Sequence, residues 1–197
     1  MAFSRRRFIV GAGMLGGIAV APLQALYTRA AFGQTTKGAG YGPLLPDPDG
    51  RLDLPAGFRY TVFSVAGDLM SDGNPVPAAH DGTAAFAGPG GTTILVRNHE
   101  IGPVGLTRVV APRSKLYDPL ARGGTTTLVV SAGRRLIKDY ASLAGTVYNC
   151  GGGATPWGSW ISCEEDTSTP DTSPLVSVPH GYNFEVPISA TAPVDPV

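Results

Sequence analysis

Glycine and proline interrupt this chain too often to leave room for long helices. The 197 residues include 27 glycines and 18 prolines, and the apolar runs between them are short and rich in valine, isoleucine, threonine and tyrosine. β-Branched and aromatic residues favour strands, whereas glycine and proline end regular elements and promote turns. The sequence therefore predicts an all-β protein built from short strands.

Alternation of apolar and polar residues indicates where these strands lie. The expected strands, in chain order, cover residues 58–64, 92–100, 125–130, 136–143, 158–165 and 181–186, and the turn at 131–134 joins two of them in a hairpin. Residues 34–55 and 67–84 are interpreted as irregular, and the glycines at 151–153 as a turn. Short antiparallel strands with polar ends favour a partial β-propeller, in which inner strands deliver side chains to a central channel; a β-sandwich is the alternative.

Residues 1–33 have the organisation of an export signal. Three arginines at 5–7 precede an uncharged glycine- and alanine-rich segment, which ends in the small-residue site at 31–33, so cleavage is expected before Gln34. The paired arginines indicate the twin-arginine route, with its translocase as a partner during export and a periplasmic or secreted destination. A stable membrane span is not expected, because four glycines between Gly11 and Gly17 and a proline at Pro22 interrupt the apolar part.

The charge balance argues against nucleic acid as a partner. Four of the 15 basic residues (Arg5, Arg6, Arg7 and Arg29) lie in the predicted signal, which leaves 11 basic and 15 acidic residues in the remainder. A net charge of −4 offers no basic surface for a phosphate backbone.

The stretch at 149–166 contains the strongest indication of chemistry. An apolar run ends in Cys163, and three acids, Glu164, Glu165 and Asp166, follow it directly. Adjacent carboxylates repel one another, so a polyvalent cation among them is the natural way to neutralise them. A thiolate beside carboxylates forms a mixed soft and hard ligand set, suited to a transition metal next to calcium. A solvated acidic loop after an edge strand is the alternative.

A second strand ends in the same way 65 residues earlier. When residues 92–100 are aligned with 157–165, Asn98 corresponds to Cys163 and Glu100 to Glu165. Because side chains alternate along a strand, the two members of each pair point to one side, and the two strand ends could face one cavity. His99 and Glu164 would point elsewhere unless the strands curl, and a lone histidine at a strand end favours a hydrogen-bonded structural role.

The two cysteines, Cys150 and Cys163, admit two interpretations. In an exported protein a pair of cysteines ordinarily forms a disulfide. If Cys163 binds a metal instead, its thiolate is a ligand and the two residues stay unpaired.

Several motifs together resemble the N-terminal half of the PhoX family of secreted alkaline phosphatases. The most specific is the segment around Cys163, and the resemblance extends across nearly all of residues 34–197. The motifs are the twin-arginine signal and residues 54–58, 97–100, 123–126, 149–153, 156–165 and 180–185.

The resemblance implies a six-bladed-type propeller, phosphomonoester hydrolysis, and a cluster of iron and calcium ions in the central channel. It implies that Cys163 is an iron ligand and that Glu100, Glu164 and Glu165 are ligands of the cluster, together with Asn98. Small-molecule phosphate esters would be the substrates.

The length of residues 34–197 suggests an incomplete propeller. It allows three or four blades of about 40–50 residues, whereas propellers close with about four to eight. The later motifs of the family have no counterpart in this sequence, so the hydrolase is expected to be incomplete in this chain. A non-catalytic calcium-binding propeller fragment is the alternative.

Overall fold

The computed structural model describes residues 40–197, which belong to two compact units that divide between Tyr60 and Thr61. The predicted export signal at residues 1–33 lies outside the described residues. Within the first unit, β1 (Leu44–Leu45) and β2 (Leu54–Pro55) form a small antiparallel pair. The Asp47 carboxylate holds the intervening loop together, because it accepts hydrogen bonds from the Leu52 backbone N–H at 3.0 Å and the Tyr60 hydroxyl at 2.6 Å.

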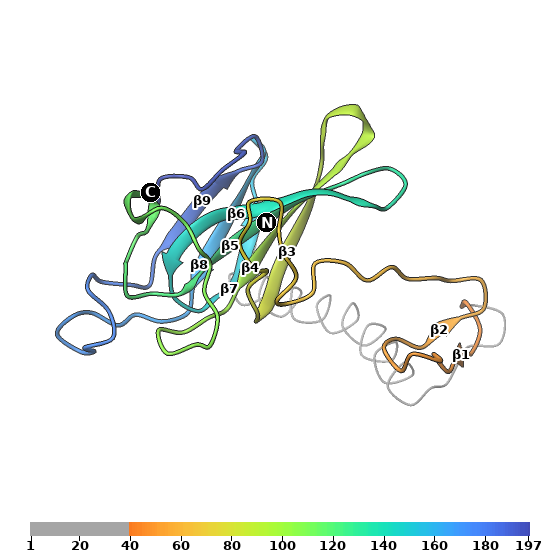
Figure 1. Ribbon diagram of the computed structural model, residues 1–197, viewed down its shortest axis with the longest axis horizontal. Helices are drawn as coiled ribbons and strands as arrows, with labels where there is room; N and C mark the ends of the chain where they lie inside the picture. Colours follow the sequence, from red (N-terminus) through yellow and green to blue (C-terminus); the bar gives the residue numbers. More distant parts are fainter. Residues whose placement is uncertain (1–39) are drawn as a thin grey trace, which may run out of the picture. The chain divides into compact units, whose positions relative to one another are not determined.

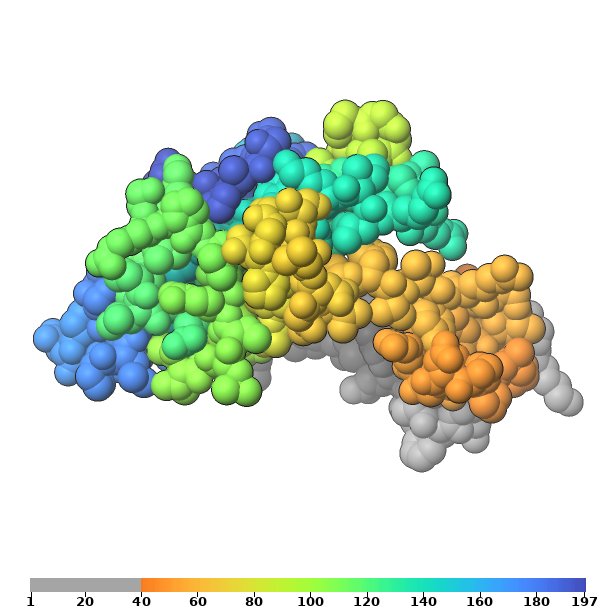
Figure 2. Space-filling model, viewed as in Figure 1, coloured from red at the N-terminus to blue at the C-terminus, as the bar shows by residue number. Residues whose placement is uncertain are grey.

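The second unit contains two antiparallel sheets (Figure 1). The four-stranded sheet has the order β3-β4-β5-β6, formed by His80–Ala87, Thr93–His99, Gly123–Val130 and Leu136–Thr146. The three-stranded sheet has the order β7-β8-β9, formed by Asn149–Ala154, Ser159–Glu164 and Asn183–Pro187. Two short 3-10 helices, η1 (Pro89–Gly91) and η2 (Arg113–Lys115), lie in the connections. The long connection between β4 and β5 covers part of the surface (green in Figure 2).

The all-β prediction is confirmed, and most of the expected strands form. The predicted strands at 92–100, 125–130, 136–143, 158–165 and 181–186 correspond to β4, β5, β6, β8 and β9, and β5 and β6 make the expected hairpin. Neither sheet of the second unit closes on itself within residues 40–197. The propeller therefore stays a prediction.

The predicted strand at residues 58–64 is wrong. The Phe58 N–H donates to the Pro55 carbonyl at 3.1 Å, which closes a turn where the strand was expected to begin. Ser64 has φ 56°, outside the extended region. A strand needs a neighbour to pair its backbone groups, and this segment instead connects the two units without one.

Two strands form where the sequence indicated loops. β3 begins at His80, inside the expected loop, and β7 includes the glycines interpreted as a turn. A Cβ on Gly82 would lie 2.3 Å from the Cys150 carbonyl oxygen, and one on Gly152 would lie 2.1 Å from the Ile161 carbonyl oxygen. Gly82 therefore marks close approach of the backbones of β3 and β7, which belong to different sheets, and Gly152 marks close approach of β7 and β8 within one sheet.

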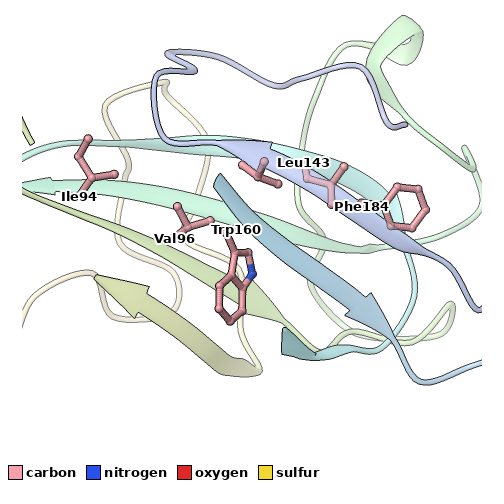
Figure 3. Packing of buried hydrophobic residues seen from close by; sticks show 6 residues of the cluster. Ile94, Val96, Leu143, Trp160 and Phe184 are labelled. Atoms are coloured by element: carbon pink, nitrogen blue, oxygen red, sulfur yellow. The ribbon is translucent and has the colours of Figure 1, made fainter. Parts of the chain in front are cut away.

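The core lies between the two sheets (Figure 3). Val96 of β4 and Trp160 of β8 pack against each other with five per cent or less of their surface exposed. Leu143 of β6, Phe184 and Val186 of β9 and Ile94 of β4 complete the cluster. Alternation along β4 and β8 directs these side chains to one face of each sheet, so the sheets pack face to face.

A buried polar network joins the same two sheets beside this core. The Asn98 side chain donates to the carbonyl oxygens of Cys150 at 3.0 Å and Gly151 at 2.8 Å. Its Oδ1 accepts from Trp160 Nε1 and from Ser162 Oγ, each at 2.9 Å. The amide is fully buried, and all four of its hydrogen-bonding positions are used.

We expect Asn98→Ala to destabilise the fold strongly. The substitution leaves the two buried donors, Trp160 Nε1 and Ser162 Oγ, and two partly buried carbonyl oxygens without their partner, and each buried group left unpaired costs about 1–3 kcal/mol. Chemical denaturation should show a loss of at least about 3 kcal/mol. Asn183→Ala, at an exposed position of β9, is the matched control and should change stability by less than about 0.5 kcal/mol. Equal effects of the two substitutions would contradict the role given to Asn98.

Candidate functional site

Three carboxylates from different strand ends come together in the second unit. Asp81 lies near the start of β3, Glu100 directly follows β4, and Glu165 directly follows β8. Pairing of β3 with β4 and a 2.9 Å hydrogen bond from the Glu100 N–H to the Ala79 carbonyl bring the first two together. We call Asp81, Glu100 and Glu165 the acidic cluster.

The neighbouring acids raise the pKa of Glu100 above its ordinary value. The largest cause is a hydrogen bond with Asp81, followed by partial burial and by the charges of Asp81 and Glu165. The structure therefore brings together two of the predicted site residues, Glu100 and Glu165, and adds Asp81.

A thiol belongs to the same neighbourhood. The pKa of Cys150 is raised to about 11. The largest cause is a hydrogen bond with Glu165, followed by burial and by the charge of Glu165. Cys150 sits at the bulge in β7, and the Glu165 N–H donates to the carbonyl of the preceding Tyr148 at 3.1 Å. Both cysteines are free thiols, so the disulfide interpretation does not describe this structure.

Among residues 40–197, no basic side chain forms a salt bridge with the acidic cluster. Between residues 40 and 197, the salt bridges join Lys115 to Asp195 and His180 to both Asp118 and Glu164. Over the same residues, no three histidine, cysteine, aspartate or glutamate side chains are arranged closely enough to hold a metal ion as they stand. The cluster is thus a group of like charges with no positive partner among the described side chains.

Glu164 lies apart from this cluster, in a buried and saturated position. Its Oε1 accepts from the Val147 N–H at 2.9 Å and from His180 Nδ1 at 2.7 Å. Its Oε2 accepts from the N–H groups of Gly181 at 2.8 Å and Tyr182 at 3.1 Å. The carboxylate is already fully hydrogen-bonded by the protein.

His180 connects Glu164 to a second buried acid. Its Nε2 lies 3.2 Å from Asp118 Oδ2, and the side chains of all three residues are inaccessible to solvent. Burial alone lowers the pKa of His180, but hydrogen bonds to Glu164 and Asp118 and their charges outweigh it and raise the pKa. Both ring nitrogens face carboxylate oxygens, so the imidazole is a doubly donating imidazolium.

Asn98 and Cys163 occupy other places. The Asn98 amide is the buried link between the sheets described above. Cys163 pairs with Asn183 across β8 and β9, and strand alternation directs it to the face opposite that of Ser162, which contacts Asn98. The thiol that contacts Glu165 is that of Cys150, not that of Cys163.

His99 has a hydrogen-bonded structural role, as expected for a lone histidine at the end of a strand. The ring is fully buried, with Nδ1 2.8 Å from the Ala78 carbonyl and Nε2 2.9 Å from Thr126 Oγ1. Burial lowers its pKa to about 3, so the ring is neutral.

Four residues near the site are not among the sequence-predicted site residues. Asp81 and Cys150 have local signals, a His-Asp-Gly stretch and a Cys-Gly-Gly-Gly stretch, but both patterns also describe turns. No local pattern indicates that Asp118 and His180 are paired, because 62 residues separate them in the sequence and only the fold brings them together.

Comparison with known proteins identifies the family. A family model described as alkaline phosphatase PhoX matches residues 39–196, which is most of the chain. The chain belongs to the PhoX family. Searches of curated proteins and of solved structures give no match for this PhoX chain. Among the residues described, no helix has both the length and the apolar character needed to cross a membrane.

In the PhoX chain, Glu165→Gln should make Cys150 more acidic. In a Cys163→Ser background, Cys150 is the sole thiol. Removal of the neighbouring negative charge favours the thiolate, so the pKa should fall from about 11 toward the ordinary value near 9. The pH dependence of alkylation measures this value. Glu185→Gln, at a carboxylate bonded to Trp157 and Ser159 instead, should leave it unchanged, and an unchanged pKa in Glu165→Gln would contradict the contact.

Glu100→Gln should stabilise the metal-free protein at pH 8 but not at pH 4. Because the pKa of Glu100 is raised in the fold, its ionisation disfavours folding once the pH exceeds that raised value, and the substitution removes this penalty. The gain should not exceed about 1 kcal/mol, because exposed charges are screened.

Glu185→Gln is the control, for which the opposite change in stability with pH is expected. Hydrogen bonds from Ser159 and Trp157 lower the pKa of Glu185, so this substitution should lose stability at pH 8 and recover it at low pH. Thermal unfolding of both variants across this pH range measures the two trends. Parallel trends would show that repulsion does not act on Glu100.

Proposed function

We propose that this chain takes part in the metal-dependent hydrolysis of phosphate monoesters, with the acidic cluster holding the cations. One observation supports this most directly: three carboxylates from three strand ends converge, with no salt bridge to a basic side chain among the described residues 40–197, in a chain of the PhoX alkaline phosphatase family. Such convergence is unfavourable without positive charge, and a polyvalent cation supplies that charge.

The donor set fits the metals that the family resemblance implies. Carboxylate oxygens are ligands for calcium, and thiolates are ligands for iron. We assign Asp81, Glu100 and Glu165 as the carboxylate ligands, and Cys163 stays the proposed iron ligand, with Cys150 as the thiol nearest the acids. Glu164 and Asn98 would first have to give up protein hydrogen bonds to bind an ion.

The protonation of the cluster makes cation binding depend on pH. The pKa of Glu100 is raised, chiefly by its hydrogen bond with Asp81 and also by partial burial and the charges of Asp81 and Glu165. A cation competes with a proton for the same carboxylate oxygens, so the cluster should bind cations more tightly as the pH rises through the raised pKa of Glu100. This direction suits a phosphatase that works under alkaline conditions.

The chemistry of the substrate determines what the bound cations and the protein would each contribute. A phosphate monoester is a dianion that water attacks slowly, and bound cations neutralise it and polarise its oxygens. The protein's part is to hold carboxylates at one solvent-accessible point. Glu165 and Asp81 are exposed and Glu100 is half-buried, so the cluster is accessible to an ester from solution.

The wider proposal follows the same family. Residues 34–197 would form the first blades of a propeller, with the two stacked sheets as blades and the cluster at the channel. Further blades would be needed for full activity. The twin-arginine translocase would export the protein to the periplasm or beyond it.

A non-catalytic calcium-binding propeller fragment is the second candidate. It is favoured by the absence, among residues 40–197, of a preformed set of three metal-ligating side chains. A site that closes only partly would bind a cation weakly and would not complete the chemistry.

The two candidates differ in hydrolysis of a generic ester. The full chain is assayed on p-nitrophenyl phosphate with added calcium and iron, alongside calcium titration. For a hydrolase, Glu100→Gln and Glu165→Gln should each lower activity by at least about tenfold to a hundredfold. Asp171→Asn, in an exposed loop, is the control and should retain activity.

Three outcomes decide between the candidates. Hydrolysis that is lost in both cluster variants and retained in Asp171→Asn supports the phosphatase. Calcium binding without hydrolysis supports the non-catalytic fragment. Absence of both, in a chain that folds, would rule out the acidic cluster as a metal site.

A further inference from the structure

An apolar cavity of about 390 Å³ lies at the other end of the strands from the acidic cluster. β3 has Asp81 near its start and ends at Ala87, which lines the cavity. β4 ends directly before Glu100, and Ile94, near its start, lines the cavity. The cavity therefore has no part in the function proposed above.

The walls of the cavity continue the apolar core. Ile94 and Val129 are direct partners across β4 and β5, so their side chains lie on the same face of the sheet. Ile188, from the segment that follows β9, packs against the core cluster and forms the facing wall. The Tyr140 hydroxyl donates to the Ala190 carbonyl at 2.6 Å, which ties this segment over the sheet.

The size of the cavity suits a small organic ligand. An apolar cavity of ~150 Å³ accepts benzene, and this one has more than twice that volume. Its volume also falls within the range of about 300–1,000 Å³ that is usual for ligand sites. It can therefore take a short hydrocarbon chain as well as a ring.

A cation lies at the rim of the cavity. Lys138 is the direct partner of Val129 across β5 and β6, and its ammonium lies 4.7 Å from the centroid of the Tyr140 ring. The side chain is exposed, and it forms no salt bridge within residues 40–197. The adjacent Asp139 points to the other face of the strand, where it accepts from the Ser71 N–H at 2.9 Å.

The whole end of the molecule around the cavity carries only positive charge. The surrounding segments, 84–94, 129–138 and 186–194, contain three basic residues and no acidic one. Besides Lys138, the basic residues are Arg134 and Arg135, both exposed in the turn between β5 and β6. This turn and the one between β3 and β4 project from the second unit (Figure 1). An anion approaching this end meets attraction without a competing carboxylate.

We propose that this cavity binds an amphiphilic anion, a carboxylate with a hydrocarbon chain. The chain would occupy the space between Ile94, Val129 and Ile188, and the carboxylate would pair with the Lys138 ammonium. A bilayer surface fits less well, because apolar groups that enter a membrane project from a surface, whereas these walls are recessed in a cavity. The site does not include the acidic cluster, so it does not rest on the proposed function.

The test compares three ligands that have the same chain and different heads. Decanoate, decanol and decyltrimethylammonium are titrated into the full chain by calorimetry, below their micelle concentrations. A chelator is present, so that no carboxylate binds through a metal at the acidic cluster. Decanoate should bind several-fold more tightly than decanol, and the cationic amphiphile should bind most weakly.

Chain length tests the cavity itself. From hexanoate to dodecanoate, each added methylene should tighten binding by up to about fourfold, the value expected for its transfer from water. The gain should stop once the cavity is full. A gain that continues through the whole series would show adsorption to an open surface and would contradict a bounded cavity.

Two pairs of variants locate the site. Lys138→Gln should weaken decanoate binding by about threefold to fivefold and leave decanol unaffected, whereas Arg113→Gln, exposed in η2, should change neither. Val129→Trp places bulk in the cavity and should weaken both ligands at least about tenfold. Its control is Ile137→Trp, at a position of β6 that is 56% exposed and does not line the cavity.

Four results would overturn the inference. They are no binding of decanoate to the folded chain, equal affinity for decanol and decanoate, equal effects of Val129→Trp and Ile137→Trp, and binding to anionic lipid vesicles without binding of monomeric decanoate. If Val129→Trp does not fold, photolabelling of the unmodified chain with a diazirine derivative of decanoate decides. Label on residues 188–191 supports the site, and label confined to other segments contradicts it.

Discussion

The side-chain amide of Asn98 is the contact on which the rest of the second unit depends. It bonds to the backbone of β7 and to two side chains of β8, while its own strand lies in the other sheet. Apolar packing of Trp160 against Val96 holds the sheets together, but such packing is non-directional and would tolerate a shift in register. The amide specifies a single alignment, because its two donors and its acceptor must all be satisfied in a buried site.

This alignment places two adjacent glutamates in opposite environments. Glu164 turns inward and takes four protein hydrogen bonds, whereas Glu165 turns outward to the acids and the thiol. The Glu164 side chain is buried and saturated with hydrogen bonds, whereas Glu165 is exposed and has acidic neighbours. Positioning and ligand binding can thus be divided between neighbours, since side chains that follow one another leave the chain in different directions.

The electrostatics of the two groups differ for the same reason. The group formed by Asp118, His180 and Glu164 contains its own cation, the His180 imidazolium, and so balances part of its charge internally. The acidic cluster forms no salt bridge with a basic side chain among residues 40–197, and the pKa of Glu100 is raised there, chiefly by its hydrogen bond with Asp81.

The sequence by itself determined the all-β class, five of the strands and the family, because strand periodicity and the motifs around Cys163 are local patterns. It also indicated Glu100 and Glu165 as partners, from their equivalent places at two strand ends. Only the tertiary structure decided that Asp81 and Cys150 join them. It also decided that His180 bridges Glu164 and Asp118. Those contacts depend on which strand pairs with which and on how closely backbones approach at glycines such as Gly82, and no local pattern of residues records either.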